Sequence, residues 1–310
     1  MERILRINKP QLPPPLIRIN VLAHFLYLLL PAVLLAACTQ DETLSPAGDD
    51  LPADTYPLQI GNITITTDEQ PWTRIAENET DGMGSHWTGG EEFYVKFEGS
   101  DEVGIYKITD AATGAVEPVK SIYWKSTQPA KIIAWYANPQ PNSANWMFLY
   151  SQDDGLAYLL RAEQTAAYGD TPVSLQFTHQ FAKVRVVAKG TADVRDIRLV
   201  NVPTNCYIEE GKITRQDDIF IDDIRMLQVE REGIGTCWEA NVGPGVELKH
   251  FRIIIFVGDG TMDPVYDLTS PVTTQAGALH TITWTVNNEG TQSIRLSTDS
   301  IGSNGTEQSQ

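Results

Sequence analysis

The sequence predicts an all-β protein built from two tandem antiparallel β-sandwiches. Apolar and polar residues alternate in many short segments, as in EFYVKF (92–97) and HTITWTV (280–286). Clusters of Gly, Asn, Asp and Pro separate these segments. Alternation with a period of two indicates strands with one buried and one wetted face, and many short strands with regular turns are typical of a sandwich. About 270 residues follow the N-terminal signal, which is enough for two cores.

The N-terminal segment carries the pattern of an export signal. Residues 1–20 contain four basic residues and only one acid, and residues 21–37 are mainly apolar but interrupted by Pro31. A membrane-spanning helix needs about 20 apolar residues, so this interrupted run favours a secretory signal instead. We therefore predict a signal peptide at residues 1–37.

A lone cysteine follows small residues at the end of this signal. Leu35-Ala36-Ala37-Cys38 resembles the bacterial lipoprotein box, in which the cysteine becomes the acylated first residue of the mature chain. Acyl chains anchor a protein to a bilayer without a spanning helix. We predict lipidation of Cys38 and a place on the outer membrane at the cell surface. Residues 38–55, rich in Pro, Asp, Gly and Ser, are expected to form a flexible tether.

The charge of the chain disfavours a nucleic-acid partner. The formal net charge is −17, and removal of residues 1–37 takes away four basic residues and one acid, which leaves −20. Binding to phosphates depends on clustered Lys and Arg. A strongly acidic chain is instead expected to be soluble and self-repelling.

Beyond the tether, alternating segments follow one another along the chain. In AKVRVVA (182–188) we expect Val184 and Val186 in the core, with Lys183 and Arg185 facing solvent. FRIIIFVG (251–258) is apolar on both faces and predicts a central strand.

One segment is ambiguous, and one region marks a domain boundary. GLAYLLRAEQTAAYG (155–169) could form a helix of about three turns, although Tyr158–Leu160 also suits a strand. We place the boundary near residues 177–181, between PVSLQF and AKVRVVA. The expected domains are therefore residues 56–178 and residues 179–310.

No catalytic motif is present in the sequence. The five histidines are far apart, and neither H-E-x-x-H nor G-x-S-x-G nor a phosphate-binding glycine loop occurs. The acids of GDGTMDPVYD (258–267) are spaced loosely like those of a calcium loop, but the later bidentate glutamate is missing. A solvated turn is the better interpretation, and we predict no enzymatic activity, no cofactor and no metal.

Two pairs of residues leave alternatives open. Cys206 and Cys237 could form a disulfide in an exported chain, or they could be two separate buried thiols. Trp124 and Trp135 could form an exposed platform for glycans, which would suit a monomeric surface binder. Alternating aromatic residues in strands more often fill the core.

Two adjoining segments carry a resemblance to a known family. TPVSLQFTHQFAKVRVVAKG (171–190), followed by DIRLVNVPTNCYIEEGKI (196–213), resembles the fimbrillin (Mfa-like) family, whose members often have V-x-L-x-F-x-H-x-x-A-K-V-x-V here. The matching positions are Val173, Leu175, Phe177, His179, Ala182, Lys183, Val184 and Val186. Upstream, WTRIAEN, GGEEFYVKF, IYWKS and AKIIAWYANP resemble strands of that family's first domain in the same order.

The resemblance implies a structural and adhesive subunit of pilus-like fimbriae. Such subunits consist of two transthyretin-like (Greek-key) sandwiches and are exported as lipoproteins. A protease cuts after an arginine behind the first strand, and the emptied groove accepts a strand from a neighbouring subunit. Here the removed strand would be about residues 56–67, and the cut would fall between Arg74 and Ile75. Arg74 could also be an ordinary surface residue.

The resemblance also points to a donor strand near the C-terminus. QSIRLSTDSI (292–301) is the expected donor, with Ile294, Leu296 and Thr298 as alternate anchors, although it could also be a native edge strand. Asp299-Ser300-Ile301 resembles an O-glycosylation acceptor, with Ser300 as the modified residue. The implied partners are other fimbrial subunits, the outer membrane through the lipid, and surface ligands of host or bacterial cells.

Overall fold

The structure, a computed structural model, describes residues 49–65, 76–77, 85–216, 220–257, 260–287 and 290–300. For residues 290–300 it describes the backbone only. The predictions for Cys38, Arg74 and Ile75 lie outside these residues. The described residues belong to one compact unit.

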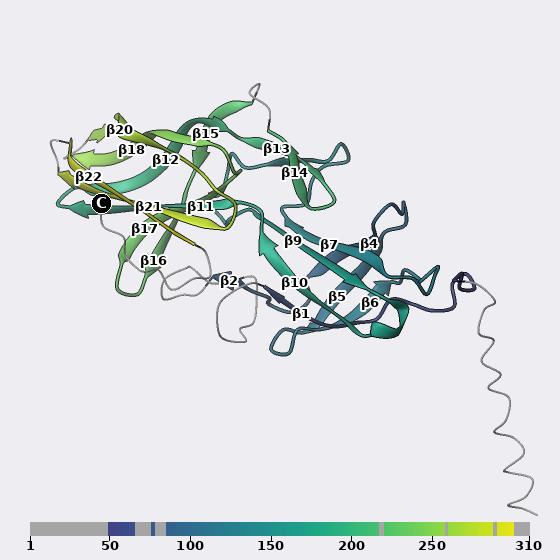
Figure 1. Cartoon of the computed structure of the whole chain (residues 1–310). Coiled ribbons are helices and arrows are strands. Elements are labelled where there is room, and N and C mark those ends of the chain that lie inside the picture. Colours follow the sequence, from purple (N-terminus) through teal and green to yellow (C-terminus); the bar gives the residue numbers. More distant parts are fainter. Residues whose placement is uncertain are drawn as a thin grey trace, which may run out of the picture. The chain divides into compact units, whose positions relative to one another are not determined.

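A seven-stranded sheet occupies the first part of the chain (Figure 1). Its strands pair antiparallel, except for the parallel pair at one end of the sheet. Its order is β1 (Ile60–Ile65), β10 (Val173–His179), β9 (Tyr158–Ala166), β7 (Ala130–Asn138), β4 (Glu92–Phe97), β5 (Gly104–Asp110) and β6 (Ala115–Lys120).

Two five-stranded sheets occupy the second part (Figure 1). One has the order β16 (Leu227–Arg231), β17 (Gly235–Val242), β11 (Ala182–Gly190), β21 (Ala278–Asn287) and β22 (Gly290–Ser300). The other contains β15 (Ile221–Arg225), β12 (Asp193–Pro203), β18 (Glu247–Val257) and β19 (Gly260–Met262), and β20 (Val265–Thr273) also pairs with β18.

Smaller elements complete the described fold. A three-stranded sheet has the order β14 (Lys212–Arg215), β13 (Asn205–Glu209) and β8 (Trp146–Phe148). A two-stranded sheet joins β2 (Ala76–Glu77) to β3 (Ser85–His86), and a 3₁₀ turn covers Tyr168–Asp170. The predicted all-β class is confirmed.

Buried apolar residues form two clusters among the described residues. One cluster lies within the seven-stranded sheet and includes Phe93, Val95 and Phe177. The other lies between the two five-stranded sheets and includes Trp284. Met147 joins this second cluster, although it precedes the predicted boundary. The limits at residues 56–178 and 179–310 therefore stay a proposal.

The strand predictions can be compared with the structure. The predicted central strand is β18, which pairs with β12 on one side and with β19 and β20 on the other. Of the helix and the strand that the sequence allowed for residues 155–169, the structure contains the strand, because residues 158–166 form β9. This segment pairs with β7 along its whole length, and its apolar run suits a strand that is buried between neighbours.

The predicted exposure of Lys183 and Arg185 is wrong. Their exposed fractions are 3% and 2%, so both faces of β11 are buried. Glu239 on the neighbouring β17 is fully buried, and the Nε of Arg185 donates to its Oε1 over 2.7 Å. The charges are tolerated because they contact a partner of opposite sign.

Candidate strand-exchange site

The segment that contains β1 buries its apolar side chains in the interior of the protein. Leu58, Ile60, Ile63 and Ile65 are each at most 8% exposed and belong to the first core. The register of β1 against β10 shifts between Ile60 and Asn62. This bulge inserts one extra residue, so that both Ile60 and Ile63 point inward although they are three positions apart.

The other side of this segment contacts the opposite end of the sheet. The backbone N–H of Ile63 donates to the carbonyl of Gly114 over 3.0 Å, and that of Leu58 donates to Ile122 over 2.8 Å. The hydroxyl of Tyr106 donates to the carbonyl of Leu58 over 2.8 Å. Residues 58–65 are therefore held between β10 and the chain around β6.

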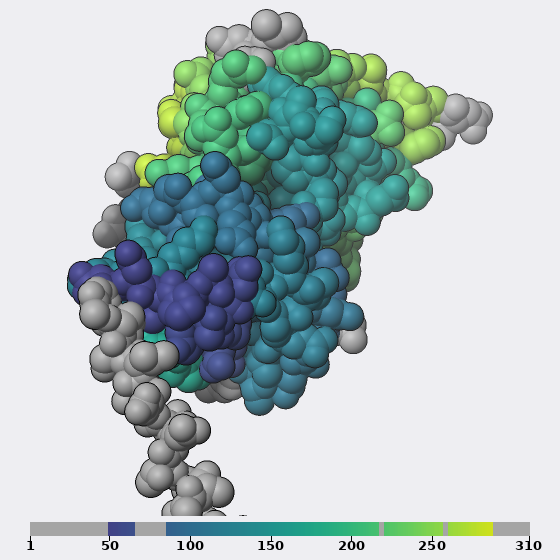
Figure 2. All heavy atoms as spheres, turned by 90° about the vertical axis from the view of Figure 1, so that its right-hand side faces the viewer, coloured from purple at the N-terminus to yellow at the C-terminus, as the bar shows by residue number. Residues whose placement is uncertain are grey.

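This placement closes the seven-stranded sheet upon itself. β1 and β6 are at opposite ends of the strand order, yet the two strands contact each other. In Figure 2, residues 49–65 form a continuous purple band on the surface beside the blue residues of the same sheet. A segment that forms the seam of a sheet can leave without breaking the pairing of the other strands.

Gly114 fits closely against β1. Its φ is +69°, in the left-handed region that glycine adopts without steric cost. A Cβ at this position would lie 2.2 Å from the carbonyl oxygen of Ile63. The turn between β5 and β6 can therefore approach β1 only because this residue is a glycine. Nothing in the local sequence indicated this contact.

The predicted donor strand is paired within its own chain. β22 runs antiparallel to β21, with Ile294 opposite Trp284 and Leu296 opposite Ile282 in the backbone register. Thr298 is opposite His280, and Ser300 is the last residue of the strand. β22 is also the end strand of its sheet. The segment is therefore an edge strand in the isolated chain, and its use as a donor stays a proposal.

The structure does not contain the disulfide that the sequence allowed. Cys206 on β13 and Cys237 on β17 are two separate buried thiols. The Sγ of Cys206 lies 4.0 Å from the carbonyl of Met147, whereas the Sγ of Cys237 lies 3.9 Å from Oε1 of Glu239. Of the two alternatives that the sequence left open, the structure contains the separate thiols.

The aromatic residues do not form the exposed platform. Trp124 is 1% exposed and lies in the first core. Trp135 is half-buried and stacks on Tyr94, with ring centroids 5.5 Å apart. Trp124 therefore fills the core, as the second alternative expected. Trp135 lies instead on the outer face of the sheet.

Two further properties concern the parts of the chain that the structure describes. Within them, no helix is long and apolar enough to cross a membrane. Across the same residues, the His, Cys, Asp and Glu side chains form no group of three or more that could hold a metal ion. In the region predicted as a solvated turn, Asp267 contacts His250 and Asp263 contacts Arg252.

A comparison with protein families decides which group the chain falls in. The family model described as fimbrillin-like matches residues 73–301, well over half of the sequence. This chain belongs to the fimbrillin-like family. The matched region includes Arg74 and β22, and the fimbrillin-like match begins after β1.

Solved structures support the fold of this fimbrillin-like chain. A candidate cell adhesion protein from Bacteroides uniformis is 14% identical with a TM-score of 0.56, covering 81% of this chain and 99% of that one. Another from Bacteroides ovatus is 14% identical with a TM-score of 0.56, covering 79% and 97%. These similarities show the fold alone. The curated proteins contain no match to the chain.

Proposed function

We propose that this protein is a fimbrial subunit that is exported as a lipoprotein on Cys38 and assembles by strand exchange. Membership of the fimbrillin-like family supports the fimbrial role. The observation that carries the mechanism is the burial of the four apolar side chains of residues 58–65 at the seam of the sheet. Arg74 follows this segment in the sequence, so a cut there would separate β1 from the rest of the chain.

Loss of β1 would make the remaining fold require a replacement strand. Burial of one large aliphatic side chain contributes about 1.5–3 kcal/mol, so the four inward side chains of this segment together contribute about 6–12 kcal/mol. A whole domain is stable by only about 5–15 kcal/mol. The emptied groove would thus favour an incoming strand. The free energy gained when that strand buries its apolar side chains would drive polymerisation.

The C-terminal edge strand is the proposed donor. Ile294, Leu296 and Thr298 alternate along β22 and can present anchors on one face of an extended segment. β22 pairs with β21 alone at the end of its sheet, so its release would leave the other strand pairs of that sheet in place. In this proposal it leaves β21 and enters the groove of the next subunit.

The test is intact-mass analysis of the protein from its host, in the wild type and in Arg74→Ala. We expect a wild-type fragment that begins at Ile75, together with polymer ladders in gels run without heating. The variant should give only the lipidated chain that begins at Cys38, without ladders. Normal ladders from Arg74→Ala would overturn the proposal.

A matched control separates processing from general damage. Arg195→Ala removes an arginine whose side chain is 60% exposed on β12, and this variant should be cut and polymerise normally. Deletion of residues 292–301 should leave the cut at Arg74 intact but abolish the ladders. Ser300→Ala tests the proposed O-glycosylation, since it should remove the mass of the glycan from the processed subunit.

A further inference from the structure

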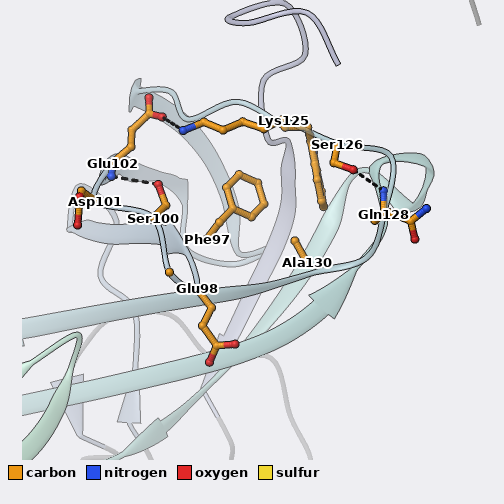
Figure 3. A pocket seen from close by; sticks show the side chains of 11 residues that line it. Phe97, Glu98, Ser100, Asp101, Glu102, Lys125, Ser126, Gln128 and Ala130 are labelled. Carbon is orange, nitrogen blue, oxygen red and sulfur yellow. Dashed lines mark hydrogen bonds and ion pairs between the residues drawn. The ribbon is translucent and has the colours of Figure 1, made fainter. Parts of the chain in front are cut away.

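A pocket of about 590 Å³ opens beside the first core. The turn between β4 and β5 and the segment before β7 form its walls (Figure 3). Phe97, Ser100 and Asp101 come from the first wall, and Ser126 and Gln128 come from the second. Its volume is within the range of about 300–1,000 Å³ that is usual for small-molecule sites.

An aromatic ring stands in the middle of this pocket. Figure 3 shows Phe97 between the two walls, with its ring toward the open space. Trp124 packs behind it, with ring centroids 4.9 Å apart at an angle of 53°. Trp124 is only 1% exposed whereas Phe97 is half-buried. The core thus fixes Phe97, and Phe97 offers an apolar face to a ligand.

Hydroxyl and amide groups surround this face. The Oγ of Ser100 accepts a hydrogen bond from the backbone N–H of Glu102 over 3.1 Å. The Oγ of Ser126 accepts one from the N–H of Gln128 over 3.1 Å. Each hydroxyl keeps its own hydrogen for donation, and the side-chain amide of Gln128 can both donate and accept. The walls can therefore serve a ligand that carries several hydroxyl groups.

The charges of the pocket disfavour an anion. Glu98, Asp101 and Glu102 face one lining lysine, Lys125, so the lining is negative and disfavours an anion. Two of these carboxylates already contact an ammonium group: Glu102 lies 3.5 Å from Lys125, and Glu98 lies 3.2 Å from Lys131. A cationic ligand would have to compete with these lysines. A neutral ligand meets no repulsion from this lining.

The second wall of the pocket is held by the backbone of the N-terminal segment. The N–H of Leu51 donates to the carbonyl of Lys125 over 2.9 Å, and the N–H of Thr127 donates to that of Asp49 over 2.7 Å. These bonds fix the chain on both sides of Ser126. A wall that is fixed before binding loses little conformational entropy when a ligand enters.

We propose that this pocket binds a neutral sugar residue of a glycan, with the apolar face of the sugar ring on Phe97. Ser100, Ser126 and Gln128 exchange hydrogen bonds with its hydroxyl groups. The site belongs to the uncleaved subunit, because residues 49–51 hold its second wall and would leave with β1 after a cut at Arg74. It gives a fimbrial subunit a way to hold a surface carbohydrate.

The experiment uses the mature chain with Cys38→Ser and a panel of neutral oligosaccharides of glucose, galactose, mannose and N-acetylhexosamines. Saturation-transfer NMR identifies the ligand, and calorimetry gives its affinity. We expect at least one oligosaccharide to bind, with affinity about tenfold lower or worse in Phe97→Ala. Gln128→Ala, an exposed change, should weaken the same ligand. Phe148→Ala removes a 41% exposed ring outside the pocket and should leave affinity unchanged.

Three results would overturn this assignment. The first is the absence of binding to every oligosaccharide at millimolar concentration. The second is binding that neither Phe97→Ala nor Gln128→Ala weakens while both variants keep the wild-type unfolding temperature. The third is tighter binding of a sialylated oligosaccharide or of Nα-acetyl-lysine amide than of any neutral sugar, because the pocket would then recognise an ion.

Discussion

Arg185 and Glu239 form an ion pair inside the protein. The Nη2 of Arg185 lies 2.5 Å from Oε1 of Glu239, and the two side chains are 3% and 0% exposed. The two residues stand opposite each other on the paired strands β11 and β17. Arg231 adds a contact of 2.6 Å from its Nη2 to Oε2 of the same carboxylate. Glu239 is therefore the carboxylate that both buried guanidinium groups contact.

Glu239→Gln should lower the free energy of unfolding by about 3–5 kcal/mol. The substitution keeps the shape of the side chain but removes the negative charge that both guanidinium groups contact. A buried charge without an opposite charge is costly, so the substitution destabilises the folded state far more than the unfolded state. Urea unfolding at neutral pH, followed by tryptophan fluorescence, measures this change.

The matched control is Glu92→Gln on β4, where the glutamate is exposed. A change at an exposed position without special contacts alters stability by less than about 0.5 kcal/mol. If Glu92→Gln and Glu239→Gln lowered the free energy of unfolding equally, the buried pair would not hold the sheet together.

Local alternation predicted one half of this arrangement. It correctly placed Val184 and Val186 in the core, because successive side chains of a strand point to opposite faces. It assigned Lys183 and Arg185 to solvent, since polar residues usually line the wetted face of a sheet. Burial of that face, and the carboxylate that meets Arg185, depend on chain more than fifty residues away.

At the candidate site too, the local sequence predicted which side chains are buried but not which distant segments they meet. Ile63 and Ile65 alternate with polar residues in the sequence, which favours one apolar face, and both are buried. The parallel pairing with β10 and the contact with Gly114 join segments distant in sequence. Similarly, the apolar run of residues 155–169 suited either helix or strand locally, and its pairing with β7 decided the outcome.

Gly114→Ala should loosen β1 specifically. The substitution introduces a Cβ 2.2 Å from the carbonyl oxygen of Ile63, so either the turn or β1 must move. The left-handed φ of +69° adds strain of about 1–2 kcal/mol. We expect a lower free energy of unfolding and faster hydrogen exchange at the amides of β1, whereas β7 and β9 keep their protection.

Gly99→Ala isolates the steric part of this effect. Gly99 has a similar φ of +76°, but no atom lies within 4 Å of a Cβ placed there. This variant should lose only the stability that the backbone strain costs, and the amides of β1 should keep their protection from hydrogen exchange. If the two variants exchanged β1 amides equally fast, the close contact with Ile63 would not hold the strand.

Tyr106→Phe should weaken the same strand and flatten the response to alkali. The change removes the hydrogen bond to the carbonyl of Leu58, at a cost of about 1 kcal/mol. Burial raises the pKa of Tyr106 to about 12, whereas an unfolded tyrosine has a pKa of about 10. Between these values the unfolded state binds fewer protons, so the free energy of unfolding falls as pH rises.

The expected difference can be measured between pH 10 and pH 11. Over this interval the free energy of unfolding of the wild type should fall by about 1 kcal/mol more than that of Tyr106→Phe. Burial also raises the pKa of Tyr136 to about 12, but that residue is present in both proteins and its contribution cancels. Parallel stability curves over this range would mean that Tyr106 ionises normally in the folded state.

The two internal thiols should be unreactive in the native protein. Burial raises the pKa of Cys206 to about 12, so almost no thiolate is present at pH 8. Cys237 is fully buried, which denies a reagent access to it. In the Cys38→Ser chain, a thiol reagent should label neither residue when folded and both in urea without reductant. Ser151→Cys, at an exposed position, should react at once and show that the reagent works. Absence of labelling in urea, with labelling restored by a reductant, would instead reveal a disulfide between Cys206 and Cys237.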